Sequence, residues 1–108
     1  MSSFDDRERA EEAKLALDEA TEFKVMARRN KLLGLWAAEL MDLHGADAEA
    51  YAKTVVLSDL EEAGDDDVFR KVRSDLDAAG VERTDTRIKD HMAELLPVAR
   101  EQVQKGAE

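Results

Sequence analysis

Few residues in this 108-residue chain are of the types that carry out catalysis. It has two histidines, His44 and His91, and no cysteine, so neither a thiol nucleophile nor a disulfide is available. The histidines lie far apart, and the chain has neither a glycine-rich phosphate loop nor a histidine pair at i, i+4 spacing. His44 follows a predicted helix end, where the helix dipole alone favours histidine. We therefore expect no catalytic residue and no enzyme activity.

A run of carboxylates is the one candidate for a cation site. Asp65, Asp66 and Asp67 follow Glu61 and Glu62 closely. The run lacks the alternating ligands and the later glutamate of a calcium-binding loop. Acidic residues at the start of a helix are also stabilising through capping and through the helix dipole. We expect no metal site here.

Arg28, Arg29 and Lys31 form a basic cluster. Two interpretations remain open for this cluster. It is either an ordinary solvent-facing part of a helix, or a patch that holds a phosphate group or an acidic partner.

The segment that must position this cluster is residues 22–43, which has the only tryptophan and many leucines. Its apolar residues recur at steps of three, four and seven, which places them on one face of a helix. We expect that face in the core, Trp36 included. It consists of Met26, Leu33, Trp36, Leu40 and Leu43, and the opposite, solvent-facing side carries Lys24, Arg28, Lys31 and Glu39.

Glycines followed by capping residues divide the rest of the chain into helices. Gly45, Gly64 and Gly80 are predicted helix ends. The predicted N-caps are Asp47, then Asp65 or Asp66, then Thr84 or Asp85. Pro97 is expected to kink or end the last helix. The prediction is an all-α, antiparallel four-helix bundle in residues 20–108, with helices at about 20–44, 47–63, 66–79 and 85–104.

The charge of the chain restricts its partners. Its formal net charge is −10, from 26 acidic and 16 basic residues, so nucleic acid and anionic membrane surfaces would repel most of its surface. No apolar run approaches the ~18 residues of a membrane span, and the start does not read as a signal peptide. We expect a monomeric, cytoplasmic protein that neither binds nucleic acid nor inserts into a membrane.

Residues 1–19 differ from the rest because they offer almost no apolar face. They combine high helix propensity with mixed charges and a phenylalanine near the tip, Phe4. A helix that buries no face is marginal by itself. We expect an N-terminal arm, marginally helical or disordered when free, that is either an inert tail or a segment that folds in the groove of a partner.

Three stretches of the chain resemble one family, the zeta subunit of alphaproteobacterial F-type ATP synthases. They are FDDRER at residues 4–9, ARRNKLLGLWAAE at residues 27–39, and EAG at residues 62–64 with VFRKVR at residues 68–73. The resemblance extends over nearly the whole chain. It implies a small four-helix inhibitor of ATP hydrolysis whose N-terminal segment enters a catalytic interface of the ATPase head, beside the central stalk, while the bundle stays outside.

The resemblance also implies which residues matter. The inhibitory arm corresponds here to Phe4, Asp5, Asp6, Arg7, Glu8, Arg9, Lys14 and Leu15. ATP or ADP, bound weakly, is the only ligand that the resemblance implies. The candidate binding patch for it consists of Arg28, Arg29 and Lys31. The family pattern has aromatic residues where this chain has Glu11 and Leu15, and each large apolar side chain lost from a buried contact costs about 1.5–3 kcal/mol of docking free energy.

Three hypotheses follow for the function. The first is a regulator that binds the ATPase head, peripheral to the inner face of the membrane, and inhibits hydrolysis through its arm. The alternatives are a weak adenine nucleotide sensor, or a protein that acts by binding alone: a family member that binds the ATPase with little or no inhibition, or an assembly or interaction protein with an unrelated partner and an inert arm.

Overall fold

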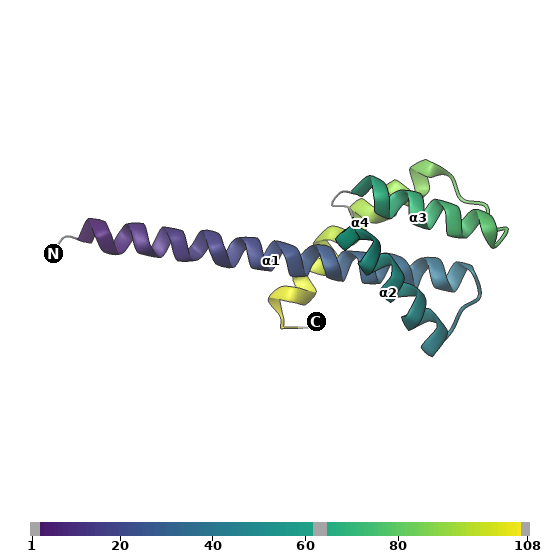
Figure 1. Cartoon of the computed structure of the whole chain (residues 1–108), viewed down its shortest axis with the longest axis horizontal. Coiled ribbons are helices and arrows are strands. Elements are labelled where there is room, and N and C mark those ends of the chain that lie inside the picture. The colour runs from purple at the N-terminus through teal and green to yellow at the C-terminus, as the bar shows by residue number, and fades with distance from the viewer. Residues whose placement is uncertain (1–2, 62–64, 107–108) are drawn as a thin grey trace.

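The computed structural model describes the backbone of residues 3–61 and 65–106, and the side chains of residues 20–59 and 65–106. This part of the chain forms four helices and no strand: α1 (Ser3–Leu40), α2 (Ala46–Glu61), α3 (Asp65–Ala78) and α4 (Asp85–Gln104). Helices α2 to α4 pack around the C-terminal half of α1, and the N-terminal half of α1 extends away from them (Figure 1). The principal extents are therefore unequal, at 66 × 25 × 23 Å. The predicted all-α four-helix fold is confirmed.

The buried ridge of α1 differs somewhat from the predicted one. Val25, Leu33 and Ala37 are fully buried. They fall on a row of four-residue steps, which is the ridge that most often packs into the groove of another helix. Of the predicted stripe only Leu33 is fully buried, whereas Met26, Trp36, Leu40 and Leu43 are half-buried at its side. The buried face of α1 is rotated about the helix axis from the predicted one, because small residues such as Ala37 let the neighbouring helices approach α1 most closely on this side.

The remaining helices each bring a short apolar row to this ridge. The fully or almost fully buried members of the common core are Val55 of α2, Val68, Val72 and Leu76 of α3, and Ile88 and Met92 of α4. Burying each of these larger side chains contributes about 1.5–3 kcal/mol.

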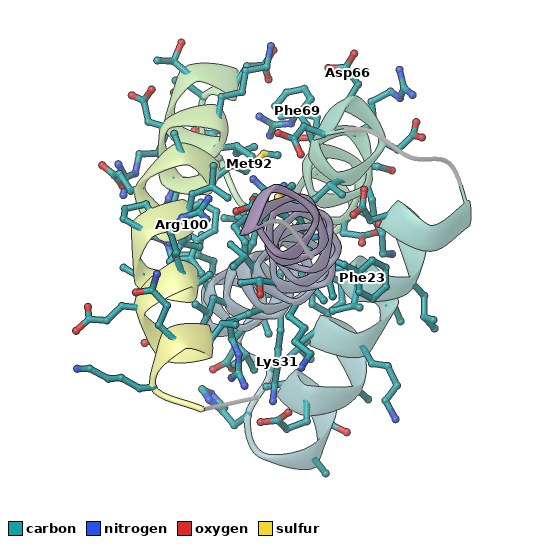
Figure 2. All side chains as sticks on the ribbon, turned by 90° about the vertical axis from the view of Figure 1, so that its left-hand side faces the viewer. Phe23, Lys31, Asp66, Phe69, Met92 and Arg100 are labelled. Carbon is teal, nitrogen blue, oxygen red and sulfur yellow. The ribbon has the colours of Figure 1, made fainter. Side chains whose placement is uncertain are left out.

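A glycine permits the closest approach between α1 and α2. A Cβ atom added at Gly34 would lie 2.6 Å from the Cα of Ala52 and 3.1 Å from its Cβ. No other residue type fits there without moving one helix. Seen along α1, α2 and α4 lie on opposite sides of it (Figure 2), and among the described residues no Cα atom of α2 lies within 8 Å of one of α4.

Helix α1 ends earlier than predicted. The Leu43 N–H donates to the Ala38 carbonyl at 2.8 Å and the Asp42 N–H donates to the Glu39 carbonyl at 3.1 Å, with Asp42 at φ 63°. This is a Schellman cap with aspartate in the left-handed position, which a short polar side chain tolerates. The prediction that the helix runs to residue 44 and stops at Gly45 is therefore wrong.

The other predicted ends are partly confirmed. Gly80 has φ 74° and closes α3, with the Val81 N–H donating to the Leu76 carbonyl at 2.9 Å. Thr84 is the N-cap of α4, because its Oγ1 accepts from the Arg87 N–H at 3.0 Å.

The predicted N-caps of α2 and α3 are wrong, because these residues lie inside the helices and not before them. Asp47 lies in the first turn of α2, and Asp65 and Asp66 lie in the first turn of α3. Carboxylates inside the first turn still interact favourably with the helix dipole. The predicted end at Gly64 falls outside the described residues.

Pro97 neither ends nor shortens α4, which continues to Gln104. A proline inside a helix leaves the carbonyl four residues earlier without its donor. That carbonyl belongs to Ala93, and both residues are exposed. Water can therefore take the missing hydrogen bond.

Candidate functional site

The N-terminal part of α1 is the first candidate. Its backbone is helical from residue 3 and continues without a break into the half of α1 that forms the bundle (Figure 1). The arm residues singled out from the sequence, Phe4 to Arg9 with Lys14 and Leu15, lie outside the described side chains, so their contacts stay a prediction.

An ion pair fixes the point where α1 leaves the bundle. Arg100 of α4 binds Glu22 of α1 through both carboxylate oxygens, with Nη2 at 3.2 Å from Oε2 and Nη1 in close contact with Oε1. The hydrogen bond to Arg100 lowers the pKa of Glu22, and the same bond raises the pKa of Arg100. Because both side chains are exposed, water weakens the pair. It nevertheless ties the last turns of α4 to the beginning of the packed half of α1.

The second feature is a buried polar network at the centre of the bundle. The side chains of Arg29 and Asn30 are 1% and 0% exposed. Arg29 Nε donates to Asn30 Oδ1 at 2.8 Å, and Arg29 Nη2 contacts Asp65 Oδ1 at 2.6 Å. A buried guanidinium requires such partners, because an unpaired charge in the interior costs several kcal/mol.

The same network reaches the other two helices. Arg29 Nη1 lies 3.5 Å from the carbonyl oxygen of Met92 in α4, and Asn30 Nδ2 donates to Asp59 Oδ2 of α2 at 3.2 Å. Two adjacent residues of α1 therefore contact all three other helices. This arrangement fixes how the helices sit relative to one another and leaves the guanidinium of Arg29 inaccessible to a ligand.

The third feature is a groove on the surface at the foot of the arm, with a volume of about 620 Å³. We call it the basic groove and define it by Phe23, Lys24, Arg28 and Lys31 of α1, facing Val56 of α2 and Val103 of α4. Figure 2 shows Phe23 toward α2 and Lys31 on the side of α1 between the ends of α4 and α2. Lys24, Arg28 and Lys31 follow one another at steps of four and three, so they line one edge of the groove.

The cations of the basic groove have few partners. Lys31 lies 3.8 Å from Glu49, a long and exposed pairing, and no described carboxylate lies within 4 Å of Lys24 or Arg28. The Nη2 atom of Arg28 is buried and has no hydrogen-bond partner among the described residues. Lys24 and Arg28 also repel each other at i, i+4 spacing, which costs a few tenths of a kcal/mol.

The structure therefore divides the basic cluster that the sequence suggested. Arg28 and Lys31 line the basic groove, whereas Arg29 points into the core. A patch made of all three side chains does not exist, because tertiary packing turns the middle one inward. Nucleotide binding to the remaining two stays a prediction.

Lys24 also belongs to this site, and its step of four to Arg28 is the sequence signal that could have identified it. Phe23, whose ring is 62% exposed, was likewise not predicted from the sequence.

The two histidines each have local partners among the described residues. His44 is exposed and contacts Asp42 at 2.8 Å, while His91 stacks on Trp36 with the ring centroids 4.3 Å apart. No group of three histidine, aspartate or glutamate side chains that could hold a metal ion exists among the described residues. None of the described helices is long and apolar enough to cross a membrane.

Comparison with known proteins identifies the family of this chain. The family model described as ATPase inhibitor subunit zeta matches residues 1–102. A protein whose structure was solved by solution NMR is 45% identical to the chain. The match covers 79% of this chain and 96% of the solved protein, and the two structures superpose with a TM-score of 0.70. No curated protein is significantly similar to the chain. Since the family model covers nearly all of the sequence, this chain belongs to the ATPase inhibitor subunit zeta family.

Proposed function

We propose that this protein binds the head of an F-type ATPase and suppresses ATP hydrolysis by inserting the N-terminal part of α1 at a catalytic interface. Membership in the zeta family supports an inhibitory, regulatory role. The insertion itself is our proposal, and it assigns no catalytic step to this chain.

The observation that carries the proposal is the shape of α1. One half of this helix is the centre of the bundle, and the other half extends beyond it (Figure 1). Residues 3–19 reach about 25 Å at ~1.5 Å per residue. A helix of that reach, held at its foot by Glu22 and Arg100, can enter a crevice that the wider bundle cannot enter.

A helical continuation of the bundle also favours binding energetically. Association loses less conformational freedom when the binding segment is already oriented by the domain that carries it. We propose that Phe4, Asp5, Asp6, Arg7, Glu8, Arg9, Lys14 and Leu15 make the contacts inside the interface, with the charged residues at its polar surfaces and the two apolar residues at its walls.

The test is ATP hydrolysis by the F-type ATPase of the same source, titrated with the full chain and with a chain that lacks residues 1–19. We expect that only the full chain inhibits. Fluorescence of Trp36, which is half-buried against the core, serves as the control that the truncated bundle is still folded. Equal inhibition by the two chains would show that the bundle is the inhibitor and that the arm is not.

A further inference from the structure

The basic groove is not explained by the arm or by the core. It concentrates three cations in a chain whose net charge is −10. Like charges side by side on a helix are unfavourable, and the structure offers them little compensation, since the one described partner is the long contact of Lys31 with Glu49 at 3.8 Å. Local conflicts of this kind are typical of sites whose partner is a second molecule.

The spacing of the cations indicates what that partner looks like. From Lys24 to Lys31 the edge of the groove spans about 10 Å of helix axis at ~1.5 Å per residue. Carboxylates on one face of a second helix, placed at the same steps of three and four, match such a row when the two helices lie side by side.

The walls of the groove fit a helix better than a phosphate compound. Compact phosphates bind where several backbone N–H groups converge at a helix N-terminus. Here the walls come from the middle of α1, from Val56 late in α2 and from Val103 at the end of α4. Phe23 adds an apolar contact at the rim, which suits a side chain of an amphipathic helix.

We infer that the basic groove binds an acidic, amphipathic helical segment of the ATPase head and so holds the bundle beside the interface that the arm enters. This inference rests on the proposed function for the identity of the partner. Thr21 already lines the groove, so the two binding surfaces follow each other directly along α1. Two linked contacts of this kind bind more tightly than either alone, because the second binding event is intramolecular.

The test uses the full chain with Lys24→Glu and Lys31→Glu together, leaving Arg28 and the arm unchanged. Both lysines are at the surface or half-buried, so the fold is expected to persist. The matched control is Arg83→Glu with Lys89→Glu, which changes the net charge equally at exposed positions away from the groove. The measurement is the Kd of each chain for the ATPase head, together with the concentration that halves ATP hydrolysis.

We expect the groove variant to raise both quantities at least roughly tenfold and to lose most of the salt dependence of association, as charge reversal at a complementary interface does. Complete inhibition should still be reached at saturation, because the arm is intact. Phe23→Ser, a change at an exposed side chain, should weaken binding in the same direction. The control should behave as the unmodified chain does.

Several results would overturn the inference. One is a groove variant that binds and inhibits like the unmodified chain while removal of residues 1–19 abolishes inhibition, which leaves the proposed function standing. A dimer in solution that the groove variant dissociates would assign the groove to a second copy of this chain. NMR shifts of Lys24, Arg28 and Lys31 on addition of millimolar ATP, without any effect of the variant on ATPase binding, would make it a small-anion site. If no form of the chain affects hydrolysis, the proposed function itself fails.

Discussion

Replacing Asp65 by asparagine tests whether the buried network holds the bundle together. Asp65 is the only described carboxylate in contact with Arg29, at 2.6 Å, and it belongs to a different helix. The substitution keeps the size of the side chain and removes its charge. The guanidinium of Arg29 then stays inside the bundle without a counter-charge.

The expected loss follows from the burial of the two partners. Removing one member of a buried ion pair typically costs about 3–5 kcal/mol, because the other charge stays buried. Arg29 is 1% exposed but Asp65 is 56% exposed, so water can partly replace the carboxylate. We therefore expect a loss of about 2–3 kcal/mol of unfolding free energy. For a domain of this size that lowers the Tm by roughly 10 °C or more.

The assay is urea unfolding followed by Trp36 fluorescence, with the Tm measured by calorimetry. Asp66→Asn is the matched control, since Asp66 is exposed and lies in the same first turn of α3. It loses the same charge and a similar interaction with the helix dipole, which is worth about 0.3–1 kcal/mol.

Two results would contradict this prediction. If Asp65→Asn and Asp66→Asn destabilise equally, the ion pair with Arg29 adds nothing beyond the helix dipole. If Arg29→Met together with Asp65→Asn is as unstable as Asp65→Asn alone, the loss does not come from an uncompensated buried charge, because removing that charge should restore part of the stability.

Three further predictions concern other parts of the molecule. Gly34→Ala should cost about 1–3 kcal/mol in urea unfolding, because the new methyl group meets the Cα of Ala52 at 2.6 Å; an unchanged midpoint would contradict the close packing of α1 on α2. Ala13→Pro should break the arm helix at a cost of about 3 kcal/mol and weaken inhibition by roughly two orders of magnitude, with the urea midpoint of the bundle unchanged; full potency would show that the arm need not be helical. The hydrogen bond from Arg100 lowers the pKa of Glu22 in the folded chain. The pair therefore stabilises the folded chain above the pKa that Glu22 has in the unfolded chain, and this stabilisation is lost as the pH falls through the lower pKa of Glu22 in the folded chain. Glu22→Gln should therefore flatten the acidic limb of the stability profile, and an unaltered limb would argue against the pair.

The helices were predictable because their signals are local. Gly80 and Thr84 satisfy backbone groups within one turn of themselves, so residue type and position were sufficient. The end of α1 was less predictable, because Asp42 takes the left-handed conformation that glycine usually takes, although Gly45 stands three residues later. The two residues compete, and the sequence alone does not reveal which carbonyls each would satisfy.

The inward position of Arg29 could not be predicted, because it depends on residues distant in the sequence. The four-residue row from Val25 through Arg29 to Leu33 marks a buried ridge only once Asp65 is known to lie opposite. The basic groove was partly predictable from the sequence, since the steps from Lys24 to Arg28 and Lys31 place the cations in one row. That this row lies opposite Val56 and Val103 depends on how α2 and α4 pack against α1.

The most direct test of arm insertion is photo-crosslinking from the arm to the ATPase head. A photoreactive residue at position 15, in place of Leu15, is compared with one in place of Ser74, which is exposed on α3. We expect that the probe at position 15 links to a catalytic subunit of the head and that linking accompanies the loss of ATP hydrolysis, while the probe at position 74 gives no such product. An inhibited complex in which position 15 links to no head subunit would contradict the insertion of the arm.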